Sequence, residues 1–195
     1  MTKAEKTRQY IIERTAPVFN KKGITGTTMS EITGATGLTK GSVYGNFKNK
    51  NELALEAFKY NYNLLRQEIQ QELTTKNSAI EKLFVFTRFY LNNYRLVFER
   101  GGCVLLNTAT DSDDQHHILL SEVKNALQGW KNTLEKIVEE GIQNGEMKPI
   151  DPDEFASFFI AVIEGSIFLS KTTNSYLPIE KNIRRLEKEI DSNRI

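Results

Sequence analysis

One short segment combines the side chains that could do chemistry: residues 37–53, GLTKGSVYGNFKNKNEL. It holds glycines, two small hydroxyl residues, a tyrosine and three lysines, and the apolar residues around them look buried. Such a set could serve an enzyme loop, a phosphate-binding loop or a surface that reads nucleic acid. The phosphate-binding loop fits poorly, because GLTKGS lacks a preceding strand and the full glycine pattern. The neighbouring elements must decide between the other two.

The other candidate for chemistry is the adjacent pair His116-His117. Neighbouring residues on a helix point about 100° apart and cannot easily share one ion, so surface histidines near acidic residues explain the pair better. We find no nucleophile–base pair and no two carboxylates at catalytic spacing. The sequence therefore predicts no catalytic residue, no metal site and no cofactor, and it does not indicate an enzyme.

The composition is that of a globular protein. Of the 195 residues, 39% are hydrophobic and 26% are charged, and this balance is unlike that of a disordered chain. The single cysteine, Cys103, excludes an internal disulfide and suits a reducing compartment. We expect no segment that spans a membrane and no secretory signal in the polar start MTKAEKTRQY. A cytoplasmic protein without a membrane partner is the expectation.

The charge is distributed unevenly. The net charge of the whole chain is +1, yet residues 1–50 hold nine Lys or Arg side chains against three acidic ones. The rest of the chain is correspondingly acidic. A basic head on an acidic body is the asymmetry expected when one end of a protein meets a polyanion, although a solvated basic face without a partner would give the same count.

Around residues 37–53, the pattern predicts short helices joined by tight turns. A helix over 4–22 ends at Gly23, and a capping box in Thr28–Glu31 opens a second helix that stops at Gly37. Thr39 can cap the third helix, and Asn49 with Glu52 can cap a long helix over 50–74. A glycine at the turn between two short helices is typical of a helix-turn-helix.

The predicted helix-turn-helix has a buried and an exposed side. The apolar residues expected to be buried between its helices are Ile32, Leu38, Val43 and Phe47. The major groove of DNA admits one helix, whose first residues must be small or polar to approach the base edges. Thr39, Gly41 and Ser42 meet this requirement. A glycine inside a helix costs about 1 kcal/mol relative to alanine, and close approach to DNA would explain Gly41.

The rest of the chain also reads as helical. Helices are predicted over 79–99, 116–143, 152–172 and 178–193, with a short segment over 102–114. We find no internal repeat and no extended strand-like alternation. The fold class predicted from the sequence is all-α.

Residues 11–53 resemble the DNA-binding domain of the TetR family of transcriptional repressors. The matching features are the helix that ends in KKG, followed by TTMSEI, GLTKGSVY and NFKNKNEL. The resemblance implies a helix-turn-helix DNA-binding domain over 1–49 and a helical effector-binding and dimerisation domain over 50–195. It also implies a set of residues that contact double-stranded operator DNA: Thr28, Thr39, Lys40, Gly41, Ser42, Tyr44, Asn46, Lys48 and Lys50.

The family resemblance further implies a homodimer that pairs through its last two long helices. Residues 155–170 are apolar on more than one face, and the final helix has a coiled-coil-like stripe. Packing inside one subunit is the alternative explanation for both stripes. The predicted interface comprises Phe155, Phe158, Val162, Gly165, Ile179, Ile183, Leu186 and Ile190.

A small-molecule effector is the third partner that the resemblance implies. The candidate lining residues are Phe86, Phe89, Tyr90, Tyr94, Cys103, Asn107, Trp130, Phe159 and Glu164. Aromatic residues at helical spacing are more often plain core than a binding pocket, so that alternative stays open. The segment RGGCVLLNTATDSDD resembles a hinge, and we expect residues 101–114 to move with the effector and to shift the long helix over 50–74.

The leading hypothesis is a DNA-binding transcriptional regulator, a repressor that an effector releases from a palindromic operator. One alternative is an activator or architectural DNA binder that uses the same head without an effector. The other is a helical enzyme whose basic patch meets a phosphorylated substrate.

Overall fold

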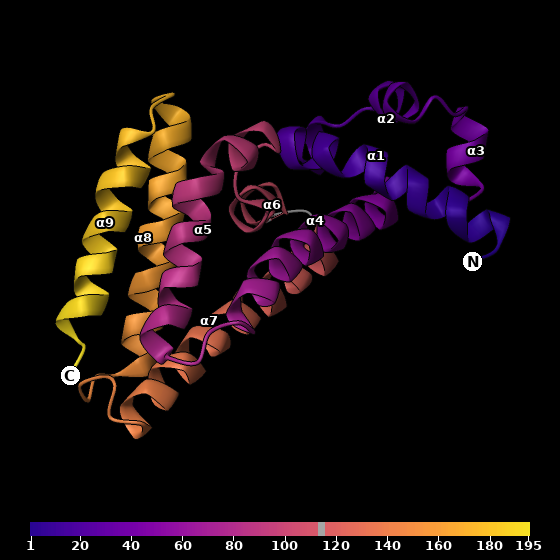
Figure 1. The fold of residues 1–195 in the computed structure, drawn as a ribbon. Helices are drawn as coiled ribbons and strands as arrows, with labels where there is room; N and C mark the ends of the chain where they lie inside the picture. The colour runs from indigo at the N-terminus through magenta and orange to yellow at the C-terminus, as the bar shows by residue number, and fades with distance from the viewer. Residues whose placement is uncertain (113–115) are drawn as a thin grey trace. The chain divides into compact units, whose positions relative to one another are not determined.

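The computed structural model describes residues 1–112 and 116–195, and it is helical throughout, as predicted (Figure 1). Within these residues, the only strand-like pairing is an isolated bridge between Met147 and Arg194. The end of the predicted hinge, Asp113 and Asp114, lies outside the described residues. The helices are α1 (Lys3–Gly26), α2 (Met29–Thr36), α3 (Lys40–Tyr44), α4 (Lys50–Leu73), α5 (Ala79–Glu99), α6 (Val104–Ser112), α7 (His117–Gln143), α8 (Pro152–Thr172) and α9 (Leu177–Ser192).

The helix starts follow the predicted capping chemistry. Thr28 and Glu31 form the capping box that opens α2, and the Thr39 hydroxyl accepts a hydrogen bond from the backbone amide of Ser42 to open α3. Asp151 caps α8 through two backbone amides. These side chains satisfy amides that have no partner within their helix.

Glycines with positive φ angles kink α1 and end α2. Gly37 adopts the left-handed conformation with φ of 69° directly after α2. The first helix runs past its predicted end, because Gly23, with φ of 71°, kinks the chain and one further turn follows. A side chain at either position would be strained.

The chain folds as two compact units. Unit 1 comprises residues 1–65 and 100–124, and unit 2 comprises residues 66–99 and 125–195. The predicted division between residues 49 and 50 falls at the start of α4, inside unit 1. Unit 1 therefore holds α6 together with the three helices of the head, α1, α2 and α3.

The core of unit 1 locks the helix-turn-helix. Ile32, Val43 and Phe47 are buried as predicted, and Leu38 is half-buried. Ile11 of α1 and Leu53 of α4 are fully buried in the same unit. Burial of such apolar side chains is the main force that holds short helices together.

In unit 2, α5, α8 and α9 pack side by side (Figure 1). The predicted dimer stripe of α9 lies in this core, because Ile179, Ile183, Leu186 and Ile190 each have 0% of their surface exposed within one subunit. These four side chains are covered by their own subunit. Packing inside one subunit therefore accounts for the stripe, and a role of these four residues in a dimer interface stays a prediction.

One helix is more apolar than the sequence analysis expected. Among the described residues, α8 alone is long and apolar enough to cross a membrane by length and composition. Phe159 and Ile163 of α8 are fully buried in unit 2, and a core helix of a soluble protein passes the same test. The side of α8 that faces away from this core also carries apolar residues, and these raise the mean hydropathy of the helix.

Candidate nucleic-acid interface

The short helix α3 presents polar residues outward from a buried anchor. Thr39, Lys40 and Gly41 are exposed, and Tyr44 has 43% of its surface exposed. Val43 between them is 1% exposed and holds the helix against the unit. The Thr39 Oγ accepts from the amide of Ser42 at 3.2 Å, so the start of α3 is fixed. The exposed surface is thus supported by a rigid base.

Packing does not explain the glycine in this helix. An added Cβ at Gly41 would lie 3.9 Å from the Oγ of Thr39, and that is an ordinary contact. The intramolecular alternative, relief of crowding between helices, therefore fails. A glycine that nothing in the fold requires, on an exposed face, fits close approach by an external partner.

A cation and an aromatic ring pair on the same face. The Lys40 Nζ lies 5.9 Å from the centroid of the Tyr44 ring. This distance is within the range of cation–π attraction, which contributes about 0.5–1 kcal/mol at exposed sites. The contact orients Lys40 along the outward face of α3.

Two of the predicted DNA-contact residues are engaged inside the head. The Asn46 Nδ2 donates to the backbone oxygen of Ser42 at 2.9 Å. The Lys50 Nζ donates to the backbone oxygen of Thr27 at 3.0 Å, so it joins α4 to the residue between α1 and α2. Both residues are half-buried. These bonds give Asn46 and Lys50 structural roles that the sequence analysis did not anticipate.

Thr28 and Lys48 keep exposed positions on the head. The Thr28 hydroxyl already makes two hydrogen bonds within the head, because it accepts from the Glu31 amide and donates to the Glu31 carboxylate. Its partner Glu31 has a pKa lowered from 4.5 to about 2, chiefly by the bond from Lys22 and then by those from Thr28. Lys48 is exposed, and its backbone amide donates to the Glu52 carboxylate at 2.7 Å.

Sequence reasoning missed the side chains of α1 that hold the head together. Arg8 donates to the backbone oxygen of Asn46 at 2.6 Å and to the Glu52 carboxylate at 3.0 Å. Its guanidinium carbon also lies 4.2 Å from the centroid of the Phe47 ring. The bonds from Lys48 and Arg8 both lower the pKa of Glu52. One arginine thus fixes the end of the helix-turn-helix to α4.

Two further α1 side chains bind the last turn of α2. The Tyr10 hydroxyl donates to the backbone oxygen of Thr36 at 3.0 Å, and the Arg14 Nε donates to that of Ala35 at 3.1 Å. Both acceptors are carbonyls left without partners at a helix end. No local sequence pattern links residues this far apart, so these contacts had no signal in the sequence.

The predicted hinge is tied to α1 within unit 1. The Asn107 Nδ2 donates to the backbone oxygens of Gly101, at 2.8 Å, and Asn20, at 3.0 Å. The Asn20 side chain donates to the backbone oxygen of Arg100 at 2.7 Å. The Asp111 carboxylate accepts from the amide of Ile24, just past the kink in α1. Residues 100–111 therefore contact α1, the helix that supports the helix-turn-helix.

Two family models match this chain. Residues 11–57 match that of the bacterial regulatory proteins of the tetR family, and residues 79–186 match the tetracyclin repressor-like C-terminal domain. The chain belongs to the TetR family. It is a DNA-binding transcriptional regulator, and the geometry described above is that of its DNA-binding head.

Individual relatives of this TetR-family regulator agree with the assignment. The repressor DhaR of Mycobacterium sp. strain GP1 is 26% identical over 179 residues, which cover 89% of this chain and 87% of DhaR. A TetR-family regulator from Cytophaga hutchinsonii is 38% identical with a TM-score of 0.94, and the match covers 100% and 98% of the two chains. One from Chloroflexus aurantiacus is 32% identical with the same TM-score and coverage.

The predicted effector residues of the regulator fall in both units. Cys103 and Asn107 belong to unit 1, where the Asn107 side chain is engaged as described. The other candidates lie in unit 2, where Phe86 and Phe159 pack edge to face with ring centroids 6.1 Å apart. The members in unit 2 are Phe86, Phe89, Tyr90, Tyr94, Trp130, Phe159 and Glu164.

Two of these unit 2 residues stand out from plain core packing. The Trp130 Nε1 is buried and has no acceptor among residues 1–112 and 116–195. Tyr94 is half-buried and stacks on Tyr176, with ring centroids 4.3 Å apart. A buried donor without an acceptor costs about 1–3 kcal/mol, so the indole of Trp130 could be satisfied by a bound molecule.

His116 differs from the expected surface histidine. It is half-buried, and its Nδ1 has no hydrogen-bond partner in the part of the chain that the structure describes, whereas His117 is exposed. Within those same residues, no three His, Cys, Asp or Glu side chains are grouped so as to hold a metal ion.

A groove of about 750 Å³ lies between α8 and α9 in unit 2. Most of its lining is apolar or small, and it includes Phe155, Phe158, Val162 and Gly165 from the predicted interface set. Phe158 on its α8 wall is 44% exposed. With Leu186 of α9, five of the eight predicted interface residues line this groove.

Proposed function

We propose that this regulator is a homodimeric repressor that binds a palindromic operator and leaves it when a small molecule binds. The observation that carries the proposal is the exposed face of α3, in which Lys40, Gly41 and Tyr44 stand over the buried anchor Val43. Small and polar residues at the start of a rigid helix suit the major groove. Such a regulator acts where the chromosome is, in the cytoplasm.

Within this proposal, the DNA-contact residues take two roles. Thr39, Gly41 and Ser42 face the base edges, while Thr28, Lys40, Tyr44 and Lys48 hold phosphates. Asn46 and Lys50 act mainly by keeping the head in shape, because their side chains bond to backbone carbonyls inside it.

The dimer forms through the groove between α8 and α9. The exposed apolar residues Phe158, Phe168 and Leu169 of α8 would be covered by a second copy of the chain. Large exposed apolar residues in one face of a soluble domain typically mark an interface. A two-fold dimer presents two reading heads one helical turn apart on DNA, about 34–36 Å.

The effector binds in unit 2, which holds aromatic residues such as Phe86 and Phe159 and the buried Trp130 Nε1, a hydrogen-bond donor without an acceptor among residues 1–112 and 116–195. Release follows from motion of the segment that includes α6, because Asn107 and Asp111 hold the end of α1. Structures with and without effector test this step, and an unmoved segment over 101–112 would contradict it.

Binding to duplex DNA at several salt concentrations tests the function itself. The probe is a duplex that carries the palindrome beside the gene of this protein, and a scrambled duplex is the control. A dimer that neutralises about eight phosphates should give a log–log slope near −7. A chain that binds neither duplex at low salt is not a DNA-binding regulator of its own locus.

A further inference from the structure

The groove between α8 and α9 contains charged side chains that the subunit itself leaves without partners. Arg185 of α9 and Glu154 of α8 both line it and are both exposed. Among residues 1–112 and 116–195, neither the Arg185 guanidinium nor the Glu154 carboxylate has a hydrogen-bond or ion-pair partner. Both charges therefore remain available to whatever covers the groove.

The other acidic side chains of the groove are already in use. The Asp151 carboxylate caps α8 by accepting from the amides of Asp153 and Glu154, at 2.9 and 3.2 Å. The Glu189 carboxylate accepts from the Asn193 Nδ2 at 3.4 Å and is half-buried. Glu154 is thus the acid of the groove whose carboxylate is left to pair.

An apolar cover would leave these charges in an unfavourable place. Phe155, Phe158 and Val162 line the same groove, so a molecule seated on it removes water from its walls. A buried charge without an opposite charge is strongly destabilising. The molecule that covers the groove must therefore bring an acid to Arg185 and a base to Glu154.

We propose that a second copy of this chain meets that requirement, with Arg185 of each copy paired to Glu154 of the other. The proposal rests on the homodimer proposed above and goes further by naming the pair that selects the partner. In a two-fold interface each contact occurs twice with the roles exchanged, so one Arg and one Glu per chain form two pairs. Arginine suits this role because its guanidinium binds a carboxylate through two parallel hydrogen bonds.

The test exchanges the charges. Arg185→Glu and Glu154→Arg variants are purified separately, and their dimer dissociation constants are measured by sedimentation equilibrium. Each variant places like charges across the interface, and we expect its dissociation constant to rise by at least about 30-fold. An equimolar mixture of the two should form heterodimers with nearly the affinity of the wild type, because each interface then holds an opposite-charge pair at one site and its reversed counterpart at the other.

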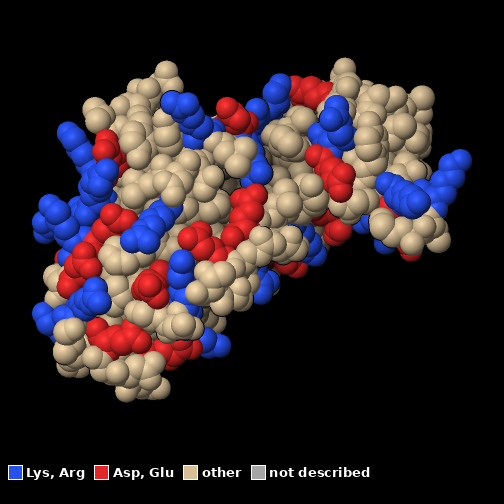
Figure 2. Space-filling view, viewed as in Figure 1, with Lys and Arg blue, Asp and Glu red and all other residues tan. Residues whose placement is uncertain are grey.

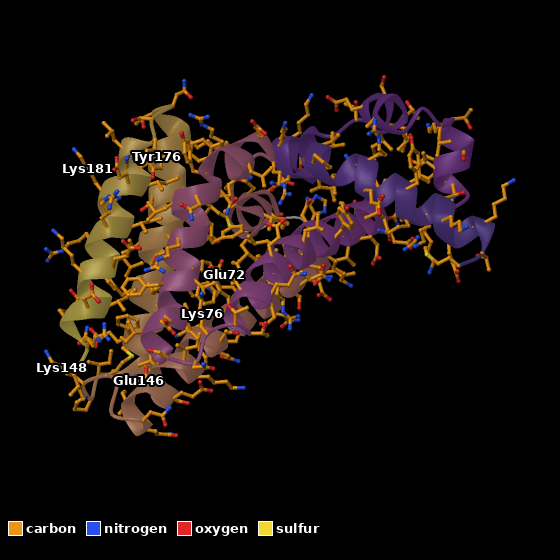
Figure 3. The ribbon with its side chains drawn as sticks, viewed as in Figure 1. Glu72, Lys76, Glu146, Lys148, Tyr176 and Lys181 are labelled. Atoms are coloured by element: carbon orange, nitrogen blue, oxygen red, sulfur yellow. The ribbon has the colours of Figure 1, made fainter. Side chains whose placement is uncertain are left out.

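Lys181→Glu is the matched control on the same helix. Lys181 is exposed and points away from the α8–α9 packing (Figure 3). Lys and Arg side chains gather over α9 (Figure 2). This variant makes the same change of charge as Arg185→Glu outside the groove, and it should leave the dissociation constant within about twofold. Equal helicity by circular dichroism shows that all variants are folded.

Each outcome decides the proposal. A wild-type chain that remains monomeric overturns the dimer and the pairing together. A wild-type dimer with an unchanged Arg185→Glu variant overturns the pairing alone, and so does a mixture that stays monomeric. The Arg185→Glu variant can also be mixed with a Glu189→Arg variant. If that mixture forms heterodimers and the mixture with Glu154→Arg does not, Arg185 pairs with Glu189 and the proposed pair is wrong.

Discussion

Helices α3 and α9 each have a buried apolar side and an exposed polar side, but the two sides differ in size and in charge. In α3, one buried anchor, Val43, supports an exposed polar face without acidic side chains. In α9, four apolar residues are fully buried, and the exposed side carries Lys181, Arg184 and Lys188 beside acidic residues. A short helix that only reads a partner needs little burial, whereas α9 is a structural part of unit 2.

The comparison also predicts that the two units respond differently to substitutions. Besides its apolar core, the head depends on hydrogen bonds from α1 side chains to backbone carbonyls, such as those of Arg8 and Tyr10. Unit 2 is held by apolar contacts among α5, α8 and α9. Substitutions in the head should therefore change DNA binding at a modest cost in stability, and substitutions in the α9 core should act mainly on stability.

The largest effect is expected in the α9 core. Ile183→Ala removes a fully buried side chain, and it should lower the free energy of unfolding by about 2–5 kcal/mol. Urea unfolding followed by circular dichroism measures the loss. Leu177→Ala, at an exposed position of the same helix, serves as the control and should cost much less. If Ile183→Ala left the stability unchanged but weakened the dimer, Ile183 would belong to the dimer interface instead.

A smaller effect is expected for the arginine that holds the head. Arg8→Ala removes the bond to the Asn46 carbonyl and the pair with Glu52, and it should lower the free energy of unfolding by about 1–2 kcal/mol. Because the α3 anchor loosens, DNA affinity should fall as well. Arg8→Lys keeps the charge but cannot make both bonds in the same geometry. Its stability and its DNA affinity should therefore lie between those of Arg8→Ala and the wild type.

Two lysines of the predicted contact set should behave differently. Lys48→Ala should weaken binding to all duplexes about tenfold and reduce the salt slope by about 1 per subunit, because an exposed phosphate contact is lost. Lys50→Ala should instead lower stability by about 1 kcal/mol and leave the slope nearly unchanged, because its Nζ bonds to the Thr27 carbonyl. Binding titrations at four salt concentrations measure both. Equal slopes for the two variants would contradict this division.

The smallest effect concerns pH. The folded-state pKa of Glu31 is about 2, below the value of 4.5 for an unperturbed glutamate. Its carboxylate therefore stabilises the head fully above pH 4.5, and this contribution is lost as the pH falls through about 2. Glu31→Gln keeps the capping shape without the charge. The stability difference between wild type and this variant should shrink over that pH range, and a constant difference would exclude the carboxylate as its cause.

The parts of the fold that depend on local chemistry could be predicted from the sequence. The capping residues Thr28 and Thr39 and the turn at Gly37 act within three or four residues of themselves, so their patterns are visible in a single chain. The family resemblance then identified the DNA-binding head, which the family model over residues 11–57 confirms, and its set of contact residues stays a prediction.

The remaining features depend on contacts between distant residues. The α9 stripe shows that a helix has an apolar side, but not whether its own subunit or a second one covers that side. Arg8 meets residues 38 and 44 positions away, and Lys50 bonds to a carbonyl 23 positions back. Spacing along the chain carries no record of such pairs, so the structural roles of Lys50 and Asn46 became visible only in the fold.

The measurement that tests the central claim most directly is the effect of Gly41→Ala on stability and on operator affinity in the same protein. An added methyl group has room at this position, with its nearest neighbour 3.9 Å away, so the free energy of unfolding should stay the same or rise by up to about 1 kcal/mol. If α3 lies against base edges, the methyl group obstructs that approach and operator affinity should fall at least about tenfold. A Gly41→Ala variant that binds the operator as tightly as the wild type would show that this face of α3 does not enter the groove.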